Sequence, residues 1–282
     1  MRLGGPVWAD PRDTEGWIAA HKKAGYTACY CPLDGTTSDD TIRAFEEAAV
    51  SADLVIAEVG AWSNPLASDE ATRRAALERC QQQLAVADRV GARCCVNIAG
   101  SRGQKWDGPD ARDMTEETFD MIVETVRAII DAVKPTRTYY TLETMPWMYP
   151  HTVDSYERLF RAIDRPRFAV HLDPVNMICS PSIYFNNGAM IRECVERLGP
   201  WIKSCHAKDI ILQPNLTTHL DEVRPGTGGL DYRAFLESLD ALAADVPLML
   251  EHLTAEDDYA KAAAYIRSVA RASGVPLHGE DR

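Results

Sequence analysis

The sequence lacks a long apolar run, a signal-peptide pattern and an excess of positive charge. No stretch in its 282 residues approaches the ~18 consecutive apolar residues of a membrane-spanning helix. The N-terminus has no apolar core of the kind found in secretory signals. Thirty Lys and Arg against 42 Asp and Glu leave a net charge of −12, which argues against nucleic acid or an anionic membrane as a partner. We therefore expect a soluble, cytoplasmic protein.

Several sequence signals of other protein classes are also missing. The eight cysteines form no CxxC pair, so we expect buried, reduced thiols rather than a structural zinc site. No Gly-rich phosphate turn follows the first predicted strand, which argues against an open doubly wound sheet. No Pro/Ser linker, repeat or low-complexity tract divides the chain. With 46% hydrophobic residues, residues 1–282 are expected to form a single domain.

What the sequence does contain is a regular alternation of two patterns. Short β-prone runs occur at Leu3–Trp8, Thr27–Leu33, Leu54–Gly60, Arg93–Gly100, Tyr139–Met145, Phe168–Pro174, Ile202–Ile210 and Pro247–Leu253. Helical periodicity occurs between them at Thr14–Ala24, Asp39–Ser51, Asp69–Val90, Thr115–Val133, Val153–Ile163, Gly188–Leu198, Tyr232–Ala244 and Asp257–Ala272. This order predicts an α/β fold, a single (β/α)8 TIM barrel. Long loops at 101–114, 175–187 and 211–230 follow strands, where barrel enzymes build their active sites.

Four successive β-prone runs end on a side chain that can bind a metal. These side chains are Glu143, Asp173, His206 and Glu251, and their spacings each fit about one strand-plus-helix unit. Alone, each has an ordinary explanation, such as a solvated glutamate or a hydrogen-bonded core histidine. A charge within an apolar run is costly unless it is paired or metal-bound, and here it recurs on four strands. The carboxyl ends of barrel strands share one mouth, so we expect the four to converge.

The residue types of this set predict one divalent cation. Three carboxylates and one imidazole favour Mn²⁺, with Mg²⁺, Co²⁺ or Zn²⁺ as alternatives. Four protein ligands leave two positions for adjacent substrate oxygens, so the cation would polarise a carbonyl and stabilise an enediolate. A glutamate on each face of the neighbouring carbon could then remove and return a proton.

These residues carry a resemblance to the xylose-isomerase-like TIM barrels, the sugar phosphate isomerase/epimerase superfamily. The matching segments are Leu142-Glu143, His171-Leu-Asp-Pro-Val-Asn176, His206-Ala-Lys-Asp209, Arg224-Pro-Gly-Thr-Gly-Gly-Leu-Asp231 and Leu250-Glu251. The resemblance implies a cation held by Glu143, Asp173, His206 and Glu251. It also implies that Glu143 and Glu251 are the acid/base pair, as in the ketose 3-epimerases. Relatives form dimers or tetramers, which implies a homo-oligomer, and some act with a second type of subunit.

The chain departs from its relatives at the substrate side. Many relatives place a histidine three residues after the aspartate, where this chain has Asn176, and a histidine on the fourth strand, where it has Asn97. His171 instead lies two residues before Asp173 and shares its face by strand alternation. For His171, substrate contact and a core hydrogen bond remain equal alternatives.

Other residues near the predicted mouth are candidates for substrate binding. Arg224 precedes a Gly-rich loop and resembles an arginine that relatives use on substrate oxygens. Lys208 and Asp209 either bind substrate, support the metal ligands or form an ordinary ion pair. Glu58 could hydrogen-bond a sugar hydroxyl, and Trp62 could form an apolar wall. Further aromatic candidates for stacking on a sugar ring or an aglycone are Trp8, Trp106, Trp147 and Tyr184.

We expect an isomerase or epimerase of a sugar or keto-sugar that works through an enediolate. The alternative is a lyase on the same scaffold, because proton removal next to a ketone can also expel a β-leaving group. The superfamily includes inosose dehydratases and subunits that cleave 3-oxo-glycosides. An endonuclease of this fold would need more histidines and a basic groove, and a non-catalytic barrel would not explain two opposed glutamates.

Overall fold

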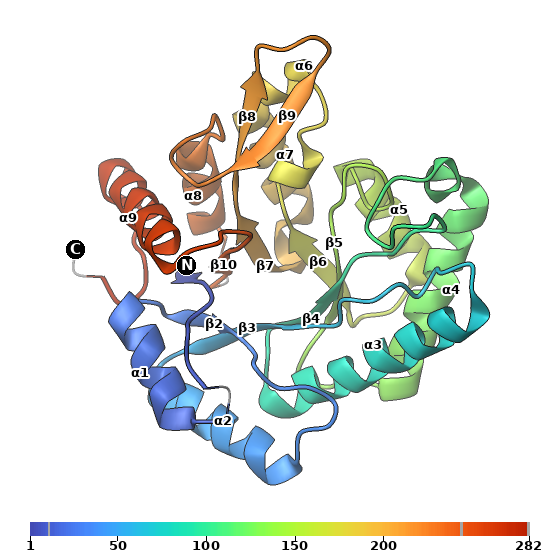
Figure 1. The fold of residues 1–282 in the computed structure, drawn as a ribbon, viewed down its shortest axis with the longest axis horizontal. Coiled ribbons are helices and arrows are strands. Elements are labelled where there is room, and N and C mark those ends of the chain that lie inside the picture. The colour runs from blue at the N-terminus through green and yellow to red at the C-terminus, as the bar shows by residue number, and fades with distance from the viewer. Residues whose placement is uncertain (11, 243–244, 281–282) are drawn as a thin grey trace.

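The computed structural model describes residues 1–10, 12–242 and 245–280, and its centre is a closed parallel barrel (Figure 1). Within these ranges the barrel has eight strands in the order β1-β10-β7-β6-β5-β4-β3-β2. They are β1 (Arg2–Gly4), β2 (Ala28–Tyr30), β3 (Val55–Gly60), β4 (Cys94–Asn97), β5 (Tyr140–Glu143), β6 (Phe168–Leu172), β7 (Ile202–Ala207) and β10 (Pro247–Leu250). The predicted TIM barrel is confirmed.

Helices follow the strands and surround the barrel (Figure 1). The helices of eight residues or more are α1 (Thr14–Ala24), α2 (Asp39–Ser51), α3 (Glu70–Val90), α4 (Glu116–Val133), α5 (Val153–Ile163), α7 (Asn187–Leu198), α8 (Tyr232–Asp240) and α9 (Glu256–Ser273). The shorter ones are α6 (Pro181–Tyr184) and the 3-10 turns η1 (Ala111–Met114), η2 (Val175–Met177) and η3 (Gly199–Trp201). None of the helices in the described ranges has the length and apolar character needed to cross a bilayer.

Polar caps fix where these helices begin and end. Asp69 caps α3, because its carboxylate accepts the backbone N–H of Thr72. Gly91 ends the same helix in the left-handed conformation, with φ at 73°. Gly199 does not act in this way, because its φ of −44° continues the chain from α7 into η3.

The segment after the seventh barrel strand differs from the sequence prediction. The run predicted as one strand over Ile202–Ile210 is divided between β7 and β8 (Asp209–Gln213). The loop predicted over 211–230 contains β9 (His219–Val223), which pairs antiparallel with β8. This β8–β9 hairpin projects beyond the ring of helices (Figure 1). The helix predicted over Tyr232–Ala244 ends at Asp240, and residues 243 and 244 lie outside the described part.

Two separate groups of apolar side chains fill the fold. The large one lies between strands and helices and includes Phe45, Leu84 and Phe235. A small one joins Ala28, Ala57 and Met249 from β2, β3 and β10, as expected for the inward face of a barrel. All eight cysteines are free as predicted, but Cys179 is exposed rather than buried.

Candidate active site

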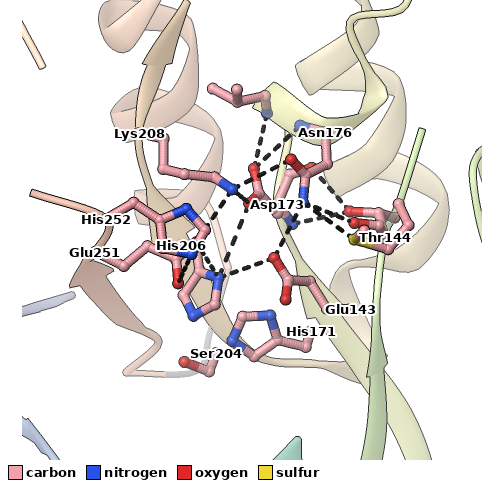
Figure 2. A network of polar contacts seen from close by, with 12 residues as sticks. Glu143, Thr144, His171, Asp173, Asn176, Ser204, His206, Lys208, Glu251 and His252 are labelled. Carbon is pink, nitrogen blue, oxygen red and sulfur yellow. Dashed lines mark hydrogen bonds and ion pairs between the residues drawn. The ribbon is translucent and has the colours of Figure 1, made fainter. Parts of the chain in front are cut away.

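The four predicted metal ligands stand at the carboxyl ends of four adjacent barrel strands. Glu143 is the last residue of β5 and His206 the last but one of β7. Asp173 and Glu251 directly follow β6 and β10. Since β5, β6, β7 and β10 are neighbours in the barrel, the four side chains face a common centre (Figure 2).

The ligand atoms of these residues lie within 4.8 Å of one another. His206 is central: its Nδ1 lies 3.1 Å from Glu143 Oε1, 2.9 Å from Glu251 Oε1 and 3.9 Å from Asp173 Oδ2. Asp173 and His206 are fully buried, and Glu251 is the most accessible of the group. The cluster therefore closes the bottom of the barrel mouth and opens outward on the Glu251 side.

Backbone groups hold Asp173 in a fixed orientation. Its Oδ1 accepts the N–H groups of Val175 (2.9 Å) and Asn176 (3.2 Å) in the turn after β6. The Thr144 hydroxyl donates to the Asp173 carbonyl at 2.8 Å and accepts its N–H at 3.1 Å. The remaining oxygen, Oδ2, is left to face the cluster.

A buried hydrogen-bond network lies beneath these ligands and is centred on Glu58 of β3. Its Oε2 lies 2.7 Å from His171 Nε2 and 3.0 Å from the Ser204 hydroxyl, and its Oε1 lies 3.2 Å from His206 Nε2. All four side chains are buried. Glu58 and His171 thus contact the predicted metal ligands from below, and in the described structure neither lines the cavity above them. Of the two alternatives for His171, the geometry favours the core hydrogen bond.

Lys208 and Asn176 connect the cluster to the mouth. The buried Lys208 ammonium lies 2.6 Å from Asp173 Oδ2, 3.1 Å from Glu251 Oε1 and 3.1 Å from Asn176 Oδ1. The Asn176 amide nitrogen donates to Glu143 Oε1 at 3.1 Å (Figure 2). Asn176 therefore bridges the lysine and a predicted acid/base glutamate.

Crowded charges shift the ionisation of this cluster. Burial raises the pKa of Asp173 to about 7, although the Lys208 ammonium opposes this. Burial alone would lower the pKa of His206, but the carboxylates of Glu251, Glu143 and Glu58 raise it well above its usual value. Burial likewise opposes a charged Glu58, yet His171 and His206 lower its pKa to about 2. The protein thus holds several buried charges of both signs against one another.

These residues fit a divalent cation. Asp173 Oδ2 and Glu251 Oε1 are buried and, among the described residues, accept no hydrogen bond, although each forms an ion pair with Lys208. Three carboxylates and an imidazole match a mixed oxygen and nitrogen site. Glu58 holds His206 through Nε2, which leaves Nδ1 for the cluster, as outer partners of metal-bound histidines do.

A cavity of about 560 Å³ lies above the cluster and brings in residues that sequence reasoning missed. Glu222 of β9 lies 3.4 Å from Lys208 Nζ and 3.1 Å from His252 Nδ1. His252 has a left-handed φ of 59° directly after Glu251, a conformation that concentrates at functional sites. The position of His252 next to Glu251 was a usable sequence signal, but Glu222 had none because the hairpin was predicted as loop.

Other predicted site residues lie in different environments. Arg224 is 3.8 Å from Asp258 and, in the described structure, is not part of the cavity wall. Asp209 accepts the N–H groups of Gly226, Gly228 and Leu230, so it holds the Gly-rich segment in place. A Cβ on Gly228 would lie 2.4 Å from Asp209 Oδ1, which explains the need for glycine there.

The remaining substrate-binding candidates lie in three places: the core, the cavity wall and a separate hollow. The Asn97 amide is buried and exchanges hydrogen bonds with the backbone of Ser63 at 3.2 and 3.1 Å. Trp62, Trp106 and Trp147 line the cavity. Trp8 packs on Tyr259 and borders a different hollow.

Known proteins similar to this chain share its barrel fold. A family model described as a xylose isomerase-like TIM barrel matches residues 18–269, and no curated protein sequence matches the chain. Similar solved structures include a 3-keto-D-glucoside 4-epimerase from E. coli (16% identity, 95% of this chain and 99% of that chain, TM-score 0.68). They also include a probable 3-DHS dehydratase from Bacillus anthracis (17% identity, 92% of this chain and 93% of that chain, TM-score 0.66). A third is a xylose isomerase-like TIM barrel protein from Mycobacterium smegmatis in complex with magnesium (16% identity, 93% of this chain and 90% of that chain, TM-score 0.65).

Proposed function

Since the chain belongs to the xylose isomerase-like TIM barrel family, we propose that it is a divalent-metal-dependent isomerase or epimerase of a sugar or keto-sugar. The convergence of Glu143, Asp173, His206 and Glu251 within 4.8 Å carries the proposal. The epimerase among the similar structures supports it. We propose Mn²⁺ as the ion, and the magnesium complex of a similar barrel makes Mg²⁺ the first alternative. When bound, the cation would polarise a substrate carbonyl and lower the energy of the neighbouring carbanion.

We propose that two glutamates of this cluster move the proton. Glu143 and Glu251 both line the cavity and contact His206 from β5 and β10, which two other strands separate. One carboxylate would remove the proton beside the carbonyl, and the other would return it to the opposite face. Asn176 holds Glu143 Oε1, so it orients the carboxylate toward the substrate carbon.

The second candidate function is a lyase that expels a leaving group after the same proton removal. An elimination needs an acid beside the leaving oxygen, and the Lys208 ammonium borders the cavity. A dehydratase is also found among the similar structures. The substrate would then be a 3-oxo-glycoside or an inosose-like ketone.

Deuterium exchange tests the proposal and separates the two reactions. The Mn²⁺-loaded protein is incubated with keto-sugars and 3-oxo-glycosides in D₂O, and products are analysed by NMR and mass spectrometry. Deuterium next to the carbonyl with an intact skeleton supports isomerisation or epimerisation, and loss of water or an aglycone supports the lyase.

The variant Glu143→Gln tests the role of Glu143 as a base, because it keeps the shape of the side chain and removes the carboxylate. We expect a loss of exchange of about 100- to 10,000-fold, because acid–base catalysis contributes about 10²–10⁴-fold, together with weaker Mn²⁺ retention. Glu237→Gln, a surface change beside Arg233 on α8, is the control and should retain full exchange. Near-normal exchange by Glu143→Gln would refute the assignment.

A further inference from the structure

The cavity above the cluster has two chemically different sides. Its ionic side is formed by Lys208 after β7, Glu222 of the β8–β9 hairpin, and Glu251 and His252 after β10. The cavity volume of about 560 Å³ lies within the range of pockets that bind drug-sized ligands, about 300–1,000 Å³. A sugar ring over the ionic side would therefore leave part of the cavity unfilled.

Aromatic side chains form the opposite side. Trp62 follows β3, Trp106 lies in the long segment after β4, and Trp147 lies between β5 and α5. They are 38%, 36% and 37% exposed, and Ile98 and Met145 complete the same wall. These indole rings expose apolar surface to water inside the cavity. A ligand that covers them removes this surface from water, which favours binding.

Among the described residues, the groups on the aromatic side that lack a hydrogen bond are the Trp62 and Trp106 indole N–H groups and the buried Asp107 Oδ1. The Trp147 indole N–H already donates to the Asp107 carbonyl at 3.1 Å. The Lys105 ammonium and the Asp107 carboxylate pair with each other at 3.2 Å. A second sugar ring placed here would leave several hydroxyls without partners, which is costly when they are buried. A flat apolar ring requires no such partners and stacks on indole.

We infer that the substrate is a glycoside-like molecule with an aromatic aglycone that binds against Trp62, Trp106 and Trp147. The sugar-derived ring lies over Glu143, Lys208 and Glu251. This inference rests on the proposed function for the position of the sugar ring, but the aromatic subsite itself depends on neither cation nor turnover.

Binding measurements with simple glycosides test the subsite. Phenyl β-D-glucopyranoside, methyl β-D-glucopyranoside and cellobiose are titrated by calorimetry into the Mn²⁺-loaded and the EDTA-treated protein. We expect the phenyl glycoside to bind at least about tenfold more tightly than the other two in both preparations, since stacking and apolar burial add more than about 1.4 kcal/mol. Equal affinities, tighter binding of cellobiose, or absence of binding by all three would overturn the inference.

Variants show whether the tryptophans are responsible. Trp106→Ala and Trp147→Ala should each weaken phenyl glucoside about five- to tenfold and leave the affinity for methyl glucoside unchanged. Trp106→Phe should restore most of the loss, because it keeps an aromatic face. Trp201→Ala is the matched control: Trp201 is 43% exposed but packs on Phe160 and, in the described structure, is not part of the cavity wall, so affinity should not change. An equal loss in Trp201→Ala, or no loss in the cavity variants, would contradict the aromatic subsite.

The two proposals can fail separately. Exchange of deuterium into free keto-sugars without any preference for the phenyl glycoside would refute only the aromatic subsite. A clear phenyl preference in a protein that neither retains Mn²⁺ nor exchanges deuterium would refute only the metal-dependent reaction.

Discussion

At the scale of single residues, Glu58 shows how a carboxylate below the site controls the atoms in it. A carboxylate with a pKa lowered to about 2 can only accept hydrogen bonds. His206 Nε2, 3.2 Å from Glu58 Oε1, then carries a proton, so Nδ1 is the nitrogen that can give up its proton and bind a cation. The same carboxylate holds His171 at 2.7 Å. By this geometry Glu58 positions the predicted metal ligand His206, and in the described structure it does not line the cavity.

Replacement of Glu58 by Gln should weaken Mn²⁺ binding about 10- to 100-fold, the usual effect of losing an outer partner of a metal ligand. Calorimetric titration of the metal-free protein with Mn²⁺ measures this without turnover. Ser204→Ala is the control, because Ser204 bonds to Glu58 Oε2 but not to His206, so its Mn²⁺ affinity should change less than about threefold. Equal affinity of Glu58→Gln and the natural protein would show that Glu58 does not position His206.

At the scale of elements, Asp88 ties helix α3 to the segment that leads into β5. Its Oδ1 accepts the backbone N–H groups of Thr136 (2.8 Å), Arg137 (2.6 Å) and Thr138 (3.1 Å). Burial opposes the charge, but these three bonds lower the pKa of Asp88. The bonds fix the start of the strand that ends on Glu143.

Asp88→Asn should destabilise the protein at pH 7 by about 1.5–3 kcal/mol, the usual contribution of hydrogen bonds to a charged group. Because the folded pKa is lowered, this stabilisation is present above the unfolded pKa of about 3.9 and is lost as pH falls through the folded pKa. Urea unfolding at pH 7 and at pH 3 should therefore show a difference from the natural protein that shrinks at low pH. Asp120→Asn on the exposed face of α4 is the control, and a constant difference at both pH values would contradict the role of the charge.

At the scale of the whole molecule, Arg2 joins the first and last strands of the barrel. Its buried guanidinium pairs with Asp245 just before β10 and with Asp53 just before β3, the latter at 2.9 Å. It also donates to the Asp53 carbonyl at 2.7 Å. These contacts close the amino-terminal end of the barrel, opposite the site. The homo-oligomer and the second subunit type expected from the resemblance stay predictions.

Arg2→Leu should lower the free energy of unfolding by about 1.5–3 kcal/mol, because charge-assisted hydrogen bonds are lost at a buried position. Chemical denaturation followed by circular dichroism measures it. Arg233→Leu, which removes an exposed pair with Glu237, should change stability by less than about 1 kcal/mol. Similar losses in the two variants would show that Arg2 does not contribute to closure.

Much of this architecture was readable in the sequence, because its signals are local. Alternating apolar runs and amphipathic stretches predicted the barrel, and the four residues that converge at its mouth could be picked out because each ends a run. The end of β7 was less readable, because Ile202–Ile210 contains no glycine or proline, so nothing local marks where the chain leaves the barrel for the hairpin.

The sequence by itself determined the strand order and the four residues that meet at the barrel mouth, since parallel strands bring their carboxyl ends to one side. Only the tertiary structure decided that Glu58 supports His206 from below, that Glu222 reaches Lys208 from the hairpin, and that Arg224 turns to Asp258 instead. These contacts join residues 14 to 148 positions apart along the chain, and two of them also depend on the path of the segment after β7. Strand register and loop packing set such distances, and no local pattern of residues encodes them.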